Sequence, residues 1–377
     1  MHKVIHSDSI KAALAARGWS QDQLAKELGE SAQVVSNWLQ GKNFPRPDKL
    51  LKLAATLKLG FDQLVKPEAD QPVIAFRKKA GAKTTDGHIV KALAMAALLK
   101  PLVAYLPQQR ALHTSLPSPS TTWAPLQNAV AQVRQQLGIG AQAVLRYEHL
   151  IKEFKQNDAL LVPVLWGQKQ NHKNALHILL PKEKVTFVYL NLDTHLEDFK
   201  FWMAHELAHV YTPDLAGTND GEDFADAFAG VLLFPQGCAE DAYAKARQTR
   251  GATQMLSELL ACAHEHSISL YTVFRQVQNF AHAKGLPPLP LADAQVHAVR
   301  NSQRSGLVSE TLFKPAPPKA EELIAATVHV FGSDFFVALK QMLTERGTGP
   351  GYLQQILDIG LQDAVALHAA LVGESAR

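Results

Sequence analysis

Cysteine is scarce in this sequence of 377 residues, which also lacks an apolar segment at its N-terminus. Cys238 and Cys262 are far apart in the sequence, so they suggest no disulfide framework, and this fits a reducing compartment. The first residues, Met-His-Lys-Val-Ile-His, do not form the apolar core of a secretory signal. We therefore expect a cytoplasmic protein.

Long apolar runs are also missing. The most apolar stretch, Ile89–Leu106, is interrupted by Lys91 and Lys100, and Pro101 would break a helix there. We interpret this stretch as a packing helix and expect no membrane association. Hydrophobic residues make up 47% of the chain, which is ample for buried cores, and the length suggests two or three domains.

The first 66 residues carry the start and stop signals of several short helices. Ser20, with Gln23 three residues later, is predicted to cap the second helix, and Ser31 is predicted to cap the third. The short gap around Gly29 between these two helices is typical of a helix-turn-helix. The predicted helices cover residues 9–17, 20–29, 31–39, 48–57 and 61–65.

Three motifs in this region resemble the Xre/Cro family of DNA-binding domains over about residues 7–66. They are Trp19-Ser-Gln-Asp-Gln-Leu-Ala25, Val34-Val-Ser-Asn-Trp-Leu-Gln-Gly-Lys42 and Arg46-Pro-x-x-Leu-x-x-Leu-Ala54. The resemblance implies that 31–39 is the recognition helix, with Val35 and Trp38 facing inward. The alternative is a helical module of the same fold that binds a protein.

The resemblance also implies which side chains contact DNA. Those expected to face the major groove are Ala32, Gln33, Ser36 and Asn37. Gln33 and Asn37 each have the amide geometry for paired hydrogen bonds to adenine. Candidate phosphate contacts, which position the protein without specifying sequence, are Gln21, Lys42, Asn43 and Arg46.

The positive charge is concentrated at this end of the chain. Residues 1–79 contain 13 Lys and Arg against 8 Asp and Glu, a net charge of +5, whereas the whole chain is +3, so residues 80–377 sum to −2. This distribution favours double-stranded operator DNA as a partner. Because the excess is modest, we expect a homodimer or a higher oligomer on DNA.

A second signal, independent of the first, is the pentapeptide His205-Glu206-Leu207-Ala208-His209. On a helix, residues four apart lie on one face, so the two imidazoles can hold one zinc ion. The preceding residues 184–191 are rich in β-branched and aromatic side chains and predict a strand. An extended substrate can pair with the edge of such a sheet.

A further predicted helix supplies the remaining groups of a zinc site. Glu222 can complete a set of two histidines and one carboxylate, with Asp223 as the rival ligand. Asp226 can accept a hydrogen bond from the non-ligating nitrogen of one histidine. Glu206 is the candidate general base in hydrolysis of a peptide bond. Zn²⁺ is the expected metal, although Mn²⁺ or Fe²⁺ would accept the same ligands.

These motifs, taken in order, resemble the ImmA/IrrE family of metallopeptidases over about residues 123–285. They are His205-Glu-Leu-Ala-His209, Glu222-x-x-Ala-Asp226-x-Phe-Ala229 and Leu232-Leu-Phe-Pro235, with the lead-in Phe201-Trp-Met-Ala204. The resemblance implies a gluzincin-like fold. It also implies limited proteolysis of a helix-turn-helix repressor, which relieves transcriptional silencing under stress or in mobile elements.

The expected fold class is α+β, mainly helical with a small sheet. We predict an all-α helix-turn-helix domain at 1–66, a linker with a packing helix at 67–122, a zincin-like peptidase domain at 123–286 and a helical region of unknown role at 287–377. Strands are predicted at 159–166, 175–180 and 185–192, and long helices at 321–344 and 351–371. His264-Glu265-His266 is interpreted as surface, because helix residues two apart do not share a face.

Two classes of function are consistent with these patterns. The first is a DNA-binding transcriptional regulator with a zinc endopeptidase domain that cleaves a repressor-like protein or the chain itself. The second is an operator-binding repressor, or a regulator of a toxin–antitoxin or phage-defence pair, whose peptidase-like domain acts as a sensor without turnover. A mutation of Glu206 would affect only the first.

Overall fold

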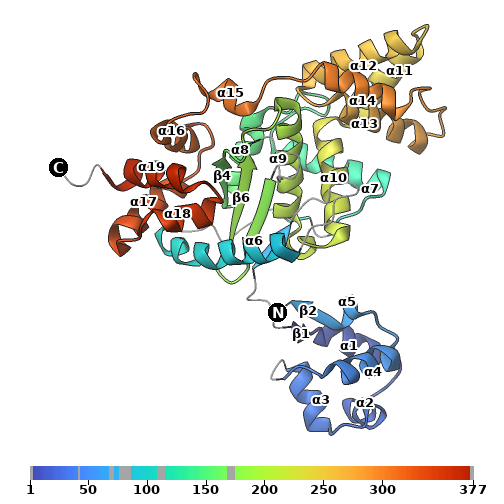
Figure 1. Cartoon of the computed structure of the whole chain (residues 1–377). Coiled ribbons are helices and arrows are strands. Elements are labelled where there is room, and N and C mark those ends of the chain that lie inside the picture. The colour runs from blue at the N-terminus through green and yellow to red at the C-terminus, as the bar shows by residue number, and fades with distance from the viewer. Residues whose placement is uncertain are drawn as a thin grey trace. The chain divides into compact units, whose positions relative to one another are not determined.

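The computed structural model describes residues 3–40, 43–67, 72–75, 86–107, 115–116, 118–167 and 175–373. The chain divides into two compact units, Met1–Gln71 and Pro72–Arg377. The structure is mainly helical with a small mixed sheet (Figure 1). This confirms the predicted fold class.

The first unit is a cluster of five short helices with a two-stranded sheet. Its elements are β1 (Lys3–Ile5), α1 (Ser7–Ala15), α2 (Gln21–Leu28), α3 (Ala32–Leu39), α4 (Pro47–Leu57), α5 (Phe61–Leu64) and β2 (Val65–Pro67). The capping box predicted at Ser20 is present: Ser20 Oγ accepts from the backbone of Gln23, and the Gln23 side chain accepts from the backbone of Ser20. The antiparallel pair of β1 and β2, which joins the two ends of the unit, was not predicted.

The second unit is built around a four-stranded sheet in the order β3-β5-β6-β4. Among the strands that the structure describes in this sheet, β6 and β4 pair parallel, whereas β3–β5 and β5–β6 pair antiparallel. The strands are β3 (Val73–Ala75), β4 (Ala159–Val164), β5 (Ala175–Leu180) and β6 (Val185–Asn191). The three predicted strands are therefore present, and β3 is an addition to them. Every residue of β6 is buried, as expected for a central strand covered on both faces.

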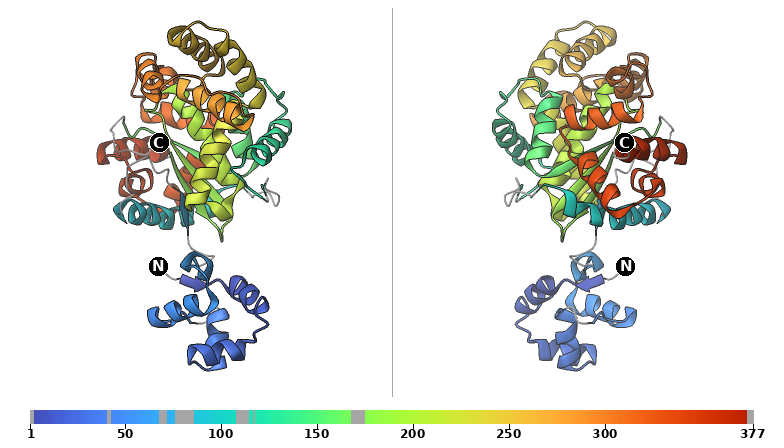
Figure 2. Two further views of the ribbon diagram at one scale, coloured as in Figure 1. Left: turned by 90° about the vertical axis from the view of Figure 1, so that its right-hand side faces the viewer. Right: turned by 90° about the vertical axis from the view of Figure 1, so that its left-hand side faces the viewer.

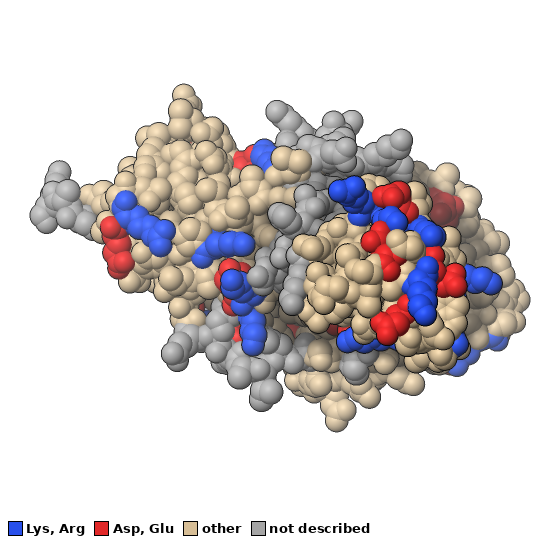
Figure 3. Space-filling view, turned by 90° about the horizontal axis from the view of Figure 1, so that it is seen from below, with Lys and Arg blue, Asp and Glu red and all other residues tan. Residues whose placement is uncertain are grey.

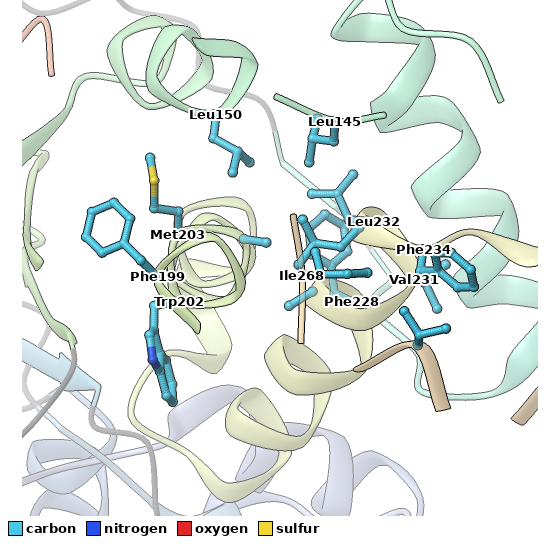
Figure 4. Packing of buried hydrophobic residues seen from close by; sticks show 14 of the residues in the cluster. Leu145, Leu150, Phe199, Trp202, Met203, Phe228, Val231, Leu232, Phe234 and Ile268 are labelled. Atoms are coloured by element: carbon cyan, nitrogen blue, oxygen red, sulfur yellow. The ribbon is translucent and has the colours of Figure 1, made fainter. Parts of the chain in front are cut away.

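Helices cover both faces of this sheet (Figure 2). One face packs against α7 (Trp123–Gln136), α8 (Tyr147–Gln156), α9 (Leu196–Tyr211) and α10 (Asn219–Leu233). On this side, Met203 of α9 lies beside Leu150 of α8, and Phe228 and Leu232 of α10 lie near Ile268 (Figure 4). The same core extends to α11 (Gln236–Arg247), α12 (Ala252–His266), α13 (Leu270–Ala283), α14 (Asp293–Ser302) and α15 (Val308–Leu312).

The opposite face is covered by segments from both ends of the unit. They are α6 (Asp86–Leu99), the 3₁₀ helix η1 (Lys100–Tyr105), α16 (Ala320–His329), α17 (Phe335–Arg346), α18 (Pro350–Leu357) and α19 (Leu361–Val372). Part of the predicted linker 67–122 therefore belongs to the second unit, since β3 joins the sheet and α6 packs beneath it. The C-terminal region likewise forms part of this core.

The predictions of two long helices, at residues 321–344 and 351–371, are wrong, because each segment forms two shorter helices. Residues 321–344 form α16 and α17, and the chain turns between them at Gly332, which has a φ of +58°. Residues 351–371 form α18 and α19, and α18 ends at Asp358 in the left-handed conformation, followed by Gly360. The prediction failed because the helical spacing of apolar residues continues across both breaks. A helix ends where the backbone adopts a non-helical conformation, and apolar spacing does not report this.

Among the described residues, no single helix combines the length and the apolar composition of a membrane span. Helices α18 and α19 meet that test only as a pair, and they are bent by 117° relative to each other.

Candidate metal centre and DNA-binding helix

The candidate metal centre lies between α9 and α10. His205 and His209 project from one face of α9, as their spacing predicts, and Glu222 projects toward them from the first turns of α10. The two histidine Nε2 atoms are 3.2 Å apart, and the Glu222 carboxylate oxygens lie 3.5 Å from His205 Nε2 and 3.3 Å from His209 Nε2. The rival ligand Asp223 is exposed and takes no part in this cluster.

These separations fit a tetrahedral zinc site. With metal–donor bonds of about 2.0–2.1 Å, two donors at a tetrahedral angle are about 3.3 Å apart. Among the residues that the structure describes, His209 Nδ1 and both Glu222 oxygens are buried and have no hydrogen-bond partner. A buried carboxylate without a hydrogen bond carries a large desolvation cost, which a coordinated cation would offset. The donor set therefore suits a divalent cation.

Asp226 is placed as the spacing on α10 predicts. Its Oδ1 lies 2.9 Å from His205 Nδ1. A carboxylate only accepts hydrogen bonds, so Nδ1 carries the proton and Nε2 is left toward Glu222. Burial disfavours a charged imidazole, but the hydrogen bond to Asp226 and the nearby Glu222 carboxylate outweigh it and raise the pKa of His205 to about 9. The site therefore stabilises positive charge at this point.

Glu222 shows the same electrostatics from the other side. Burial alone would raise the pKa of its carboxyl group, but the imidazoles of His205 and His209, whose Nε2 atoms lie 3.5 and 3.3 Å from its oxygens, lower the pKa to about 2. Glu222 is thus ionised at neutral pH, which is the form that binds a metal.

Sequence reasoning missed His177, a fully buried histidine on β5. Its Nδ1 lies 3.4 Å from Glu206 Oε2, and its ring packs edge-on against His209 with centroids 5.5 Å apart. Burial lowers the pKa of His177, so the ring is neutral at neutral pH. The available signal was a single histidine in the otherwise apolar strand Ala-Leu-His-Ile-Leu-Leu.

Glu206 is almost wholly buried on α9, between the two histidines in sequence. One of its oxygens, Oε2, lies 3.4 Å from Nδ1 of His177, on the sheet that α9 packs against. The carboxylate of the candidate base therefore lies in the same buried polar group as the two histidines of α9.

The interpretation of His264-Glu265-His266 as surface holds for the first two residues, which are exposed. It is wrong for His266, which is buried with its ring 5.0 Å from that of Phe234. The backbone carbonyl of His266 also accepts a hydrogen bond of 2.6 Å from Lys200 Nζ. His266 is therefore buried at the end of α12 by tertiary packing that residue spacing does not reveal.

The predicted recognition helix α3 is oriented as expected. Val35 and Trp38 are buried, Ala32 and Gln33 are exposed, and Ser36 and Asn37 are partly exposed. The Gln33 side-chain amide donates to Asn37 Oδ1 at 3.0 Å, and Gln40 donates to Ser36 Oγ at 3.1 Å. The bond between Gln33 and Asn37 uses one donor and one acceptor, so each of these two amide groups has further donor and acceptor capacity for a base edge.

Three of the four candidate phosphate contacts lie at the surface of the first unit. Gln21, Asn43 and Arg46 are exposed, whereas Lys42 lies outside the described residues. On the face drawn in Figure 3, Lys and Arg alternate with Asp and Glu. One of the acidic residues of the first unit, Glu30, forms an ion pair with Lys49, whose Nζ lies 2.7 Å from Glu30 Oε1.

Comparison with known proteins supports the helix-turn-helix prediction for the first unit. A helix-turn-helix family model of the Xre type matches residues 10–64. The match supports a DNA-binding regulator that binds double-stranded DNA. No curated protein and no solved structure matches the chain.

Proposed function

We propose that this DNA-binding regulator is also a zinc-dependent endopeptidase, which cleaves a repressor-like protein or its own chain to control gene expression. The observation that carries the proposal is the meeting of His205, His209 and Glu222 at zinc-like separations beside Glu206. The order of these motifs is also that of the ImmA/IrrE metallopeptidases. A protein that carries both units can act on transcription at the DNA to which it binds.

The residues have distinct roles in this proposal. His205, His209 and Glu222 would hold the metal, and Asp226 would orient His205. When bound, Zn²⁺ lowers the pKa of a coordinated water toward about 7 and polarises the scissile carbonyl. Glu206 would accept the proton of the attacking water and return it to the leaving amine, while His177 holds the Glu206 carboxylate in place.

On DNA, α3 would read bases and the loops around it would contact phosphates. Gln33 and Asn37 would each pair with an adenine edge in the major groove. Because the charge excess of the first unit is small, we propose that two copies bind an operator together.

The first test is the metal content of the purified full chain. We expect about one zinc per chain in the wild type and a large loss in His205→Ala. The matched control is His264→Ala, which removes an exposed histidine from α12 and leaves the metal in place. If wild type and His205→Ala hold equal amounts of metal after reconstitution, the metal centre does not exist.

The second test separates catalysis from sensing. Glu206→Gln keeps the three ligands but removes the candidate base, so it should bind zinc and be unable to cleave. We would compare it with wild type and with Glu265→Gln, which changes an exposed glutamate on α12, for fragmentation between residues 66 and 122 and for cleavage of a purified helix-turn-helix repressor. Equal gene regulation by wild type and Glu206→Gln would instead favour a sensor without turnover.

A further inference from the structure

The strand β3 is the first part of the second unit, one residue after the boundary between the two units. It lies at one end of the sheet and pairs antiparallel with β5, with Val73 opposite Leu179, Ile74 opposite Ile178 and Ala75 opposite His177. Without β3, the backbone groups on that side of β5 would form an open edge. Such an edge is where an extended peptide adds to a sheet.

This pairing brings β3 to the candidate metal centre. Residues directly opposite each other in a sheet project from the same face. Ala75 therefore projects on the same face as His177, whose Nδ1 is 3.4 Å from Glu206 Oε2. Ala75 is itself buried, whereas Ile74 packs against the core on the other face of the sheet.

A second contact holds β3 from the side of the metal-binding helices. Gly217 lies in the connection between α9 and α10 and has a φ of +77°. A Cβ atom at this position would stand 2.8 Å from the carbonyl oxygen of Ile74 and 3.5 Å from Val73 Cγ1. The connection between the two ligand-bearing helices thus closes directly onto β3, and only glycine permits that approach.

We propose that Val73–Ala75 is an internal occupant of the peptide-binding edge, held where an extended substrate would lie. This rests on the proposed peptidase function. The occupant also indicates the substrate class: an extended apolar peptide that runs antiparallel to β5 and presents a small side chain opposite His177. An external peptide competes with β3, so its apparent affinity equals its intrinsic affinity multiplied by the fraction of molecules in which β3 is unpaired.

The test uses the full chain carrying Glu206→Gln, so that no peptide is consumed. Into it we would introduce Ile74→Asp, which places a carboxylate in an apolar contact and releases β3 without altering α9 or α10. The control is Val90→Asp, at a position on α6 that is 65% exposed. The first readout is hydrogen exchange of the β5 amides, residues 175–180. The second is binding of a fluorescent peptide with the sequence Gln-Pro-Val-Ile-Ala-Phe of residues 71–76.

Ile74→Asp should speed exchange of the β5 amides and tighten peptide binding, each by about tenfold or more, while Val90→Asp matches the parent. Gly217→Ala should produce the same change by pushing on β3. Its control is Gly138→Ala, which has a similar φ of +71° but no neighbour within 4 Å. Unchanged β5 exchange and unchanged peptide affinity in both Ile74→Asp and Gly217→Ala would overturn the inference.

The two proposals fail in different ways. If the chain binds zinc and cleaves, but β5 exchange and peptide affinity do not respond to Ile74→Asp, only the role of β3 is wrong. If β5 exchange responds but the chain holds no zinc and Glu206→Gln changes nothing, β3 covers an edge that serves no peptidase, and the substrate assignment is wrong.

Discussion

Helices α3 and α9 both carry polar residues assigned to function. On α3 these side chains are exposed to solvent, at least in part, whereas on α9 they are buried in the protein. On α3, the apolar Val35 and Trp38 are buried and Gln33 remains in solvent. On α9, His205, Glu206 and His209 are themselves buried. A polar side chain in solvent costs no folding free energy, whereas a buried one is costly unless it is paired. The burial of the polar side chains of α9 therefore needs a compensating interaction, whereas the exposed polar side chains of α3 need none.

Lys200 shows what a buried polar group on α9 looks like when the protein itself provides its partner. It is 2% exposed, and its Nζ donates to the carbonyl of His266 at 2.6 Å. Burial lowers the pKa of Lys200 to about 8. The described part of the chain offers no such hydrogen bond to the Glu222 oxygens, and the cation that we propose would offset the cost of burying that carboxylate.

The largest expected effect tests which carboxylate completes the metal centre. Glu222→Ala removes a donor that lies within 3.5 Å of both histidine Nε2 atoms, so zinc should be lost from the purified chain. Asp223→Ala, its exposed neighbour on the same helix, is the matched control and should keep about one zinc per chain. Metal analysis after dialysis decides this, and loss in the Asp223 variant alone would reverse the assignment.

A smaller effect is expected at Asp226, which touches the site only through His205. Asp226→Asn weakens the hydrogen bond to His205 Nδ1, so zinc affinity should fall by about 10–100-fold while the metal can still bind. Competition with a zinc chelator measures this change. An affinity equal to that of wild type would show that the contact does not orient His205.

On α3, the corresponding prediction concerns sequence recognition. Asn37→Ala and Gln33→Ala should each weaken operator binding by about 1–3 kcal/mol, because each removes a paired contact to a base. Binding to unrelated DNA should change little. Gel-shift titrations with operator and with random DNA distinguish the two, and an equal loss on both would move these residues to a purely positional role.

The smallest expected effect belongs to Arg46, an exposed residue just before α4. If it contacts a phosphate, Arg46→Ala should weaken binding to all sequences alike and lower the salt dependence of log K by about one ion. Lys11→Ala removes one exposed charge from α1 instead and serves as the control. A salt dependence equally altered in both variants would point to net charge rather than to a contact.

Local patterns predicted much of this architecture. Ser20 and Gln23 predicted their capping box, and the spacing of His205 and His209 predicted that both face one side of α9. The strands β4, β5 and β6 were recognisable from runs of apolar residues. Helix ends inside apolar segments were not, because Gly332 and Asp358 stop helices whose periodicity continues beyond them.

The sequence by itself determined the DNA-binding unit, the helices that carry the candidate metal ligands and the choice of histidine and carboxylate as their donors. These features depend on residues within a few turns of one another, where spacing and capping decide the geometry. Tertiary structure alone decided that Glu222 rather than Asp223 turns toward the histidines, that His177 lies against Glu206, and that Ala75 lies opposite His177. These contacts join segments far apart in the chain, and only the packing of α9 and α10 on the sheet brings them together.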